Sequence, residues 1–83
     1  MKITVLQTGG FAGLHRQAEL DTTVEPDGTE IEAVVARADF TLPATPPQPD
    51  RLNYHIEAGD QHIDIREQDL TEEFRWLIDR VLR

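Results

Sequence analysis

The sequence contains neither cysteine nor serine. Without cysteine there are no disulfide bonds and no thiolate metal ligands, and the lack of both residue types removes the two commonest catalytic nucleophiles. No apolar run approaches the roughly 18 residues that a membrane-spanning helix needs. The first residues form a strand pattern instead of the basic and apolar segments of a signal peptide. We therefore expect no contact with membranes and a cytoplasmic location.

Positive charge is also scarce. Eight lysine and arginine residues are set against 16 aspartate and glutamate residues, which gives a formal net charge of -8. Nucleic acids and anionic membranes bind cationic surfaces, so we expect neither as a partner and look for a protein instead. The 83 residues are enough for one small domain with a limited core. We expect this single domain, residues 1–83, to be a monomer when free.

Two strand patterns flank a glycine-rich segment near the start of the chain. Residues 2–8 carry Ile3 and Val5 on one face, and residues 14–21 alternate in the same way. Leu6 breaks the first alternation, which suggests a strand that is covered on both faces. A short connection with glycine is typical of a hairpin with a bulge or an open loop. We expect the two strands to be antiparallel neighbours.

A first helix is predicted after the break at residues 25–28. Thr29 and Glu32 have the spacing of a capping box, and the helix should end near Asp39. Its apolar face is predicted to contain Ile31, Val34, Val35 and Ala38.

A second, strongly amphipathic helix is predicted from about Leu70 to Arg83, with Asp69 and Glu72 as its capping box. Acidic residues in its first turn and arginines in its last turn agree with the helix dipole. The predicted apolar stripe consists of Leu70, Phe74, Leu77, Ile78, Val81 and Leu82.

Residues 51–67 form the clearest hairpin in the sequence. Gly59 and Asp60 make a two-residue turn, and centring the strands on it fixes their register. One face then pairs Ile56 with Ile63 and Tyr54 with Ile65, toward the core. The other face pairs Glu57 with His62, His55 with Asp64 and Asn53 with Arg66. We interpret these histidines and carboxylates as exposed cross-strand ion pairs and not as a zinc site, and we expect neither metal nor cofactor.

A proline-rich connector, residues 43–50, separates the two halves of the chain. Proline fixes the backbone and lacks a donor for a sheet, so this segment is an extended surface crossover or a pre-ordered contact loop. The element order is strand, strand, helix, connector, strand, strand, helix. We therefore predict an α+β fold, in which a four-stranded antiparallel sheet carries two helices on one face.

The segment Gly9-Gly10-Phe11-Ala12-Gly13-Leu14 is unusual because an aromatic residue stands in a glycine turn. Two interpretations remain open. The glycines allow a tight bulged turn that Phe11 pins to the sheet, or the segment presents Phe11 and Leu14 to a partner. Trp76 poses a similar question. It is predicted nearly opposite the apolar stripe of the last helix, where it stacks over Arg80 or contacts a partner.

The chain resembles the emfourin family. The resemblance rests mainly on Gln7-Thr8-Gly9-Gly10-Phe11-Ala12-Gly13-Leu14, followed by Arg16 and Leu20-Asp21. Weaker similarities follow in order along nearly the whole chain: Ala38-Asp39-Phe40 with Leu42-Pro43, Asp50-Arg51-Leu52-Asn53-Tyr54, Glu67 to Leu70, and Leu77-Ile78.

Emfourins are protein inhibitors of thermolysin-like zinc metallopeptidases, the protealysin group among them. The resemblance implies that this chain is not an enzyme but blocks one by occupying its cleft with surface loops. The zinc then belongs to the peptidase, and the chain has no catalytic residues of its own. Thermolysin-like enzymes favour a bulky apolar residue after the cleaved bond, which Phe11 or Leu14 mimics in this hypothesis. The candidate partner-binding residues are Gly9, Gly10, Phe11, Ala12, Gly13, Leu14 and Trp76.

The alternative is an acidic protein–protein interaction module, antitoxin-like or an assembly partner, with no peptidase as its target. Charge and fold are the same in both hypotheses. Only the second predicts that no peptidase is affected.

Overall fold

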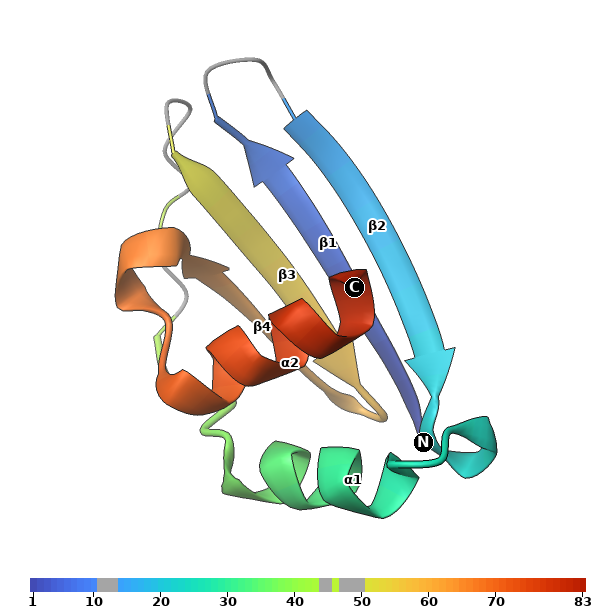
Figure 1. Ribbon diagram of the computed structural model, residues 1–83. Coiled ribbons are helices and arrows are strands. Elements are labelled where there is room, and N and C mark those ends of the chain that lie inside the picture. Colours follow the sequence, from blue (N-terminus) through green and yellow to red (C-terminus); the bar gives the residue numbers. More distant parts are fainter. Residues whose placement is uncertain (11–13, 44–45, 47–50) are drawn as a thin grey trace.

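The computed structural model describes residues 1–10, 14–43, 46 and 51–83, without the side chain of Leu14 (Figure 1). Its elements follow the predicted order, with two short 3₁₀ turns, η1 and η2, added. The strands are β1 (Lys2–Gly9), β2 (Leu14–Asp21), β3 (Leu52–Ala58) and β4 (Gln61–Arg66). The other elements are η1 (Thr22–Val24), α1 (Gly28–Arg37), η2 (Glu67–Asp69) and α2 (Glu72–Leu82). The α+β fold is therefore confirmed.

The four strands form one antiparallel sheet in the order β2-β1-β3-β4. Both predicted hairpins are present, and all five cross-strand pairs predicted around Gly59 and Asp60 have the predicted register. The sheet also contains a pairing between the two hairpins, in which β1 lies beside β3 and Val5 is opposite Ile56. The first strand of the chain is thus bonded on both sides.

Both helices lie on the same side of the sheet (Figure 1). Helix α2 crosses the strands. Helix α1 lies at one end of the sheet, and the opposite end is the one at which β1 ends and β2 begins. The core between the helices and the sheet contains Ile3, Val5, Ile31, Val34, Val35, Tyr54, Ile56, Ala58, Ile63, Ile65, Phe74, Leu77, Ile78 and Val81. Leu6 is half-buried among Gln17 and His55 on the other face, which no described helix covers. The sequence suggested that β1 is covered on both faces, but the described helices cover only its inner face.

The predicted helix starts were also wrong. Helix α1 begins at Gly28, and its N-cap residue Asp27 makes no side-chain capping bond. The carboxylate of Glu32 accepts from the hydroxyl of Thr22 in η1, so it does not complete a capping box with Thr29. Gly28 approaches the same turn so closely that a Cβ there would be 1.9 Å from the carbonyl oxygen of Thr22. Tertiary packing against η1 therefore determines this start.

Helix α2 begins two residues later than predicted, because Thr71 caps it. The hydroxyl oxygen of Thr71 accepts a hydrogen bond from the backbone N–H of Phe74, with 3.3 Å between the atoms. Asp69 ends η2 and pairs instead with Arg66 at 2.9 Å. Leu70 precedes the helix but still packs against the core.

Most of the proline-rich connector lies outside the described residues. Pro43 and Pro46 belong to no helix or strand, as the sequence predicted.

Candidate functional site

The end of β1 shows why the chain has two consecutive glycines there. Gly9 and Gly10 have φ angles of 91° and 83°, which side-chain-bearing residues rarely adopt. The N–H of Gly10 donates to the carbonyl oxygen of Arg51, at 3.1 Å. A Cβ at Gly9 would be only 2.4 Å from that oxygen. These two glycines are therefore required by the backbone itself, whatever the turn contacts.

The rest of the predicted binding segment is described only at its end. Phe11, Ala12 and Gly13 lie outside the described residues. Leu14 begins β2 opposite Gly9, and its side chain is not described. The placement of Phe11 toward the sheet or toward a partner thus stays a prediction.

The glycine turn and the connector meet the sheet at the same end. The carbonyl oxygen of Arg51 accepts from Gly10 and also from the side-chain amide of Asn53, at 3.0 Å. Arg51 directly precedes β3, so one oxygen atom links the end of β1 to the start of β3. Figure 1 shows both chain segments leaving the sheet at this end, opposite α1.

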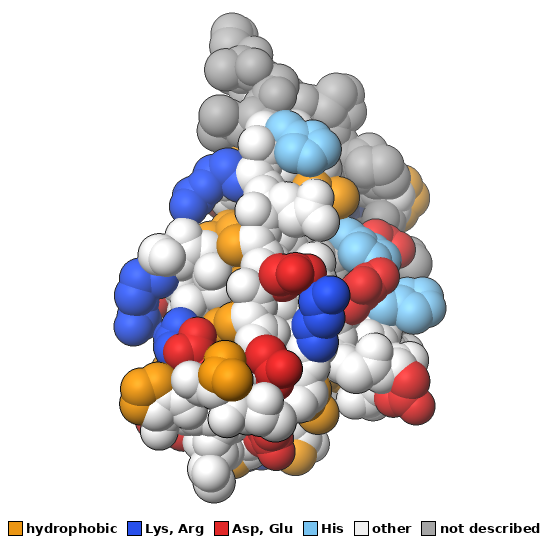
Figure 2. Space-filling model, turned by 90° about the vertical axis from the view of Figure 1, so that its right-hand side faces the viewer, with side chains coloured by type: hydrophobic (Ala, Val, Ile, Leu, Met, Phe, Trp, Pro, Cys, Tyr) orange, Lys and Arg blue, Asp and Glu red, His pale blue; other side chains and the backbone are white. Residues whose placement is uncertain are grey.

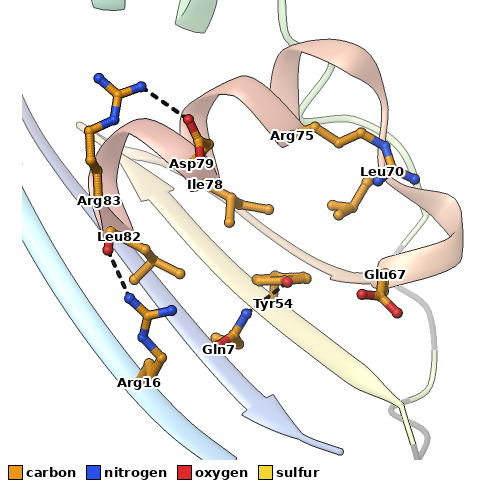
Figure 3. Close-up of a pocket in the computed structure, with 10 residues that line it drawn as sticks. All are labelled: Gln7, Arg16, Tyr54, Glu67, Leu70, Arg75, Ile78, Asp79, Leu82 and Arg83. Atoms are coloured by element: carbon orange, nitrogen blue, oxygen red, sulfur yellow. Dashed lines mark hydrogen bonds and ion pairs between the residues drawn. The ribbon is translucent and has the colours of Figure 1, made fainter.

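A hollow of about 280 Å³ lies between α2 and the sheet, on the half of the inner face nearer this end (Figure 3). We call it the Gln7–Tyr54 hollow. Its lining residues are Gln7, Arg16, Tyr54, Glu67, Leu70, Arg75, Ile78, Asp79, Leu82 and Arg83. They come from β1, β2, β3, η2, α2 and the residues next to α2.

The floor of the hollow is a buried polar pair. The side-chain amide of Gln7 donates to the hydroxyl oxygen of Tyr54 at 2.8 Å, and the two residues are only 8% and 7% exposed. Within the described part of the chain, the Tyr54 hydroxyl proton has no acceptor and the Gln7 amide oxygen has no donor. The floor therefore retains one donor and one acceptor side by side.

The rim of the hollow is charged. The Arg16 guanidinium donates to the carbonyl oxygen of Leu82 at 2.8 Å, and Arg83 pairs with Asp79 at 3.0 Å. The arginine satisfies a carbonyl at the C-terminal end of α2, where cations are favoured. Arg75 is exposed and makes no ion pair with any described residue. Two of the three arginines thus keep a charge that no described carboxylate pairs.

Trp76 lies in a different place from the glycine turn. It is half-buried against the core and lines a second hollow with Val34 and Arg37 of α1, which is at the opposite end of the sheet. The Arg80 guanidinium binds the Asp27 carboxylate with two bonds of 2.9 and 2.8 Å. This ion pair joins α2 to the residue before α1. The structure therefore does not bring Trp76 together with Gly9 and Gly10, the candidate residues that it describes in full.

The second hairpin carries its histidines on the outer face of the sheet. His55 contacts Asp64 through Nδ1 at 2.7 Å and Glu57 through Nε2 at 3.0 Å. The hydrogen bond to Glu57, then Asp64, raises the pKa of His55 above its usual value. Figure 2 shows histidine side chains next to acidic side chains at the right-hand edge of the molecule. The described residues contain no group of side chains that could hold a metal ion.

The fold is thus a small α+β domain, and its described part has neither a metal site nor a helix long and apolar enough to cross a membrane. The chain matches the emfourin family over residues 5–82 and belongs to that family. It is accordingly a protein of the protease-inhibitor type, which is consistent with a chain that is not an enzyme. No curated protein and no solved structure matches it.

The sequence interpretation missed the Gln7–Tyr54 hollow. A signal was present, because Gln7 continues the inward alternation of Ile3 and Val5, where an apolar residue is expected. Tyr54 was assigned to the core side from the register of its hairpin, without a partner for its hydroxyl. Its hydroxyl needs a partner when buried, and that partner comes from the other hairpin.

Proposed function

We propose that this protein inhibits a thermolysin-like zinc metallopeptidase by occupying its cleft. Membership of the emfourin family is the observation that carries this proposal. The inhibitory surface in this proposal is the end of the sheet where the glycine turn and the connector meet. Phe11 supplies the bulky apolar side chain that the peptidase accepts after a cleaved bond.

The anchoring of the chain segments at this end supports the proposal. A loop that is ordered before it binds loses less conformational entropy on docking. Gly10 and Asn53 both bond to the carbonyl oxygen of Arg51, which holds the two chain segments together where they meet the sheet. This anchoring supports a role of the turn in contact with the peptidase.

The test is a titration of a thermolysin-like peptidase with the protein, followed by the rate of peptide hydrolysis. We expect saturable inhibition. Phe11→Ala should weaken the affinity by about 2 kcal/mol or more, as expected for an aromatic hot spot. Val24→Ala is the matched control, because Val24 is 78% exposed in η1 and lies away from the turn.

Two results would contradict parts of this proposal. Unchanged affinity in a folded Phe11→Ala variant would remove the turn from the inhibitory surface. If Trp76→Ala weakened the affinity instead, the contact would lie at the α1 end. The absence of inhibition of any thermolysin-like peptidase would favour an acidic interaction module without a peptidase target.

A further inference from the structure

We propose that the Gln7–Tyr54 hollow is a second contact site for the target peptidase. It receives the backbone of one extended residue and a neighbouring aliphatic side chain from an acidic segment of the peptidase surface. This inference rests on the proposed function. It adds a site that is separate from the glycine turn and uses only described residues.

The polar floor is the first reason. No buried side-chain nitrogen or oxygen atom of the described residues lacks a hydrogen-bond partner, so an unpaired polar atom on this floor is open to the hollow, where a docked group can reach it. The Tyr54 hydroxyl proton and the Gln7 amide oxygen have no partner in the described protein. One residue of an extended segment supplies both partners, because its own C=O and N–H point to the same side. The C=O accepts from the hydroxyl and the N–H donates to the amide oxygen.

The walls and the rim of the hollow indicate which side chains accompany that extended residue. Leu70, Ile78 and Leu82 line the hollow, and Leu70 and Leu82 are only partly buried. An aliphatic side chain would remove this apolar surface from water. Three arginines and two carboxylates, Glu67 and Asp79, line the hollow, so positive charge is in excess there although the net charge of the chain is -8. Two of the arginines, Arg16 and Arg75, have no carboxylate partner among the described residues. Charge complementarity therefore favours an acidic residue beside the extended residue.

The position of the hollow connects it to the proposed inhibitory surface. Gln7 is two residues before Gly9 on β1, so both are on the inner face of the sheet. Tyr54 is likewise two residues after Leu52, which starts β3 opposite Gly9. The hollow thus begins two residues from the pair of Gly9 and Leu52, and a partner docked at this end of the sheet can contact both places.

The experiment measures the inhibition constant Ki of the full-length protein and four variants against the same thermolysin-like peptidase. Tyr54→Phe removes the hydroxyl and keeps the ring, and Gln7→Met removes the amide at similar length. Each should raise Ki about tenfold, the equivalent of one hydrogen bond. Gln17→Met is the matched control, since Gln17 is exposed on the opposite face of the sheet.

Arg75→Ala completes the set, because Arg75 is exposed and without an ion pair in the described structure, so the fold does not depend on its charge. It should raise Ki several-fold and reduce the dependence of Ki on ionic strength. This readout remains informative even if Gln7→Met or Tyr54→Phe fails to fold, which the thermal midpoint of each variant reveals.

The outcomes separate the two proposals. The proposal that the hollow is a contact site is overturned if the wild-type protein inhibits but the folded variants, Arg75→Ala included, keep the wild-type Ki. It is equally overturned if Gln17→Met raises Ki as much as Gln7→Met. If the wild-type protein inhibits no thermolysin-like peptidase, the proposed function fails, and the hollow as a peptidase contact fails with it.

Discussion

The inner face of the sheet has two halves with different chemistry, although the same strands build both. Toward α1, Val5 and Ile56 are opposite each other and fully buried beneath the helices. Two residues closer to the glycine turn, Gln7 on β1 and Tyr54 on β3 are opposite each other and line the hollow. We refer to these regions as the covered half and the open half. Fold stability is concentrated in the first, whereas the second retains unused hydrogen-bonding groups.

The largest effect should come from the covered half. Phe74 is fully buried, and its ring meets that of Phe40 edge-to-face with 5.2 Å between the centroids. Phe74→Ala should lower the free energy of unfolding by about 3–5 kcal/mol, because it leaves a cavity. Urea denaturation measures this loss. A loss below 1 kcal/mol would mean that the core does not depend on this side chain.

The glycine turn at the border of the open half should be the next most sensitive position. Gly9→Ala should cost about 3 kcal/mol, because a positive φ and a backbone overlap act together. Gly59→Ala is its matched control and should cost about 1 kcal/mol. Gly59 also has a positive φ, of 63°, but no atom within 4 Å of the added Cβ. Equal losses in thermal unfolding would show that the contact with Arg51 does not matter.

The start of α2 should show an intermediate effect. Thr71→Ala removes the N-cap and should cost about 1 kcal/mol of stability. Asp69→Ala removes the cap that the sequence predicted, and it should cost less, because only a surface pair with Arg66 is lost. Comparing the chemical denaturation of the two variants checks this order. A larger loss of stability in Asp69→Ala than in Thr71→Ala would indicate that Asp69 is the N-cap of α2.

The smallest effect on stability is expected on the outer face of the sheet, which carries His55. Folding raises the pKa of His55 above its usual 6.5, because the protonated ring donates to Glu57 and Asp64. This contribution is fully present below pH 6.5 and disappears as the pH rises through the raised pKa. It should amount to less than about 1 kcal/mol. Thermal midpoints between pH 6 and 9 measure it.

His55→Gln is the variant for this comparison, since glutamine keeps polar contacts but does not titrate in this range. The thermal midpoint of the wild-type protein should exceed that of the variant at pH 6, and this difference should shrink as the pH rises. A difference that stays constant from pH 6 to 9 would contradict the assignment.

The sequence was sufficient where local rules and burial agreed. The two-residue turn at Gly59 and Asp60 fixed the register of the second hairpin, and the alternation of Ile56 and Tyr54 identified its inner face. The fold class followed from the order of the elements. The family followed from the segment around Gly9 and Gly10, which the match over residues 5–82 confirmed.

The sequence was insufficient where two local solutions compete or where distant residues meet. Asp69 and Thr71 both suit an N-cap, and the bond to Arg66 decides between them. Glu32 could have capped α1, but Thr22 provides a tertiary partner. The hollow depends on the pairing of β1 with β3, so Gln7 and Tyr54 meet although they are 47 residues apart.

The central place of β1 has a consequence for how the chain folds. Each hairpin joins strands that are close in sequence, and such local pairs form quickly. The pairing of Gly9 with Leu52 instead closes a segment of more than 40 residues that includes η1, α1 and the connector. Closing this long loop costs entropy before any contact across it forms. The meeting of β1 and β3 is therefore expected to limit the folding rate.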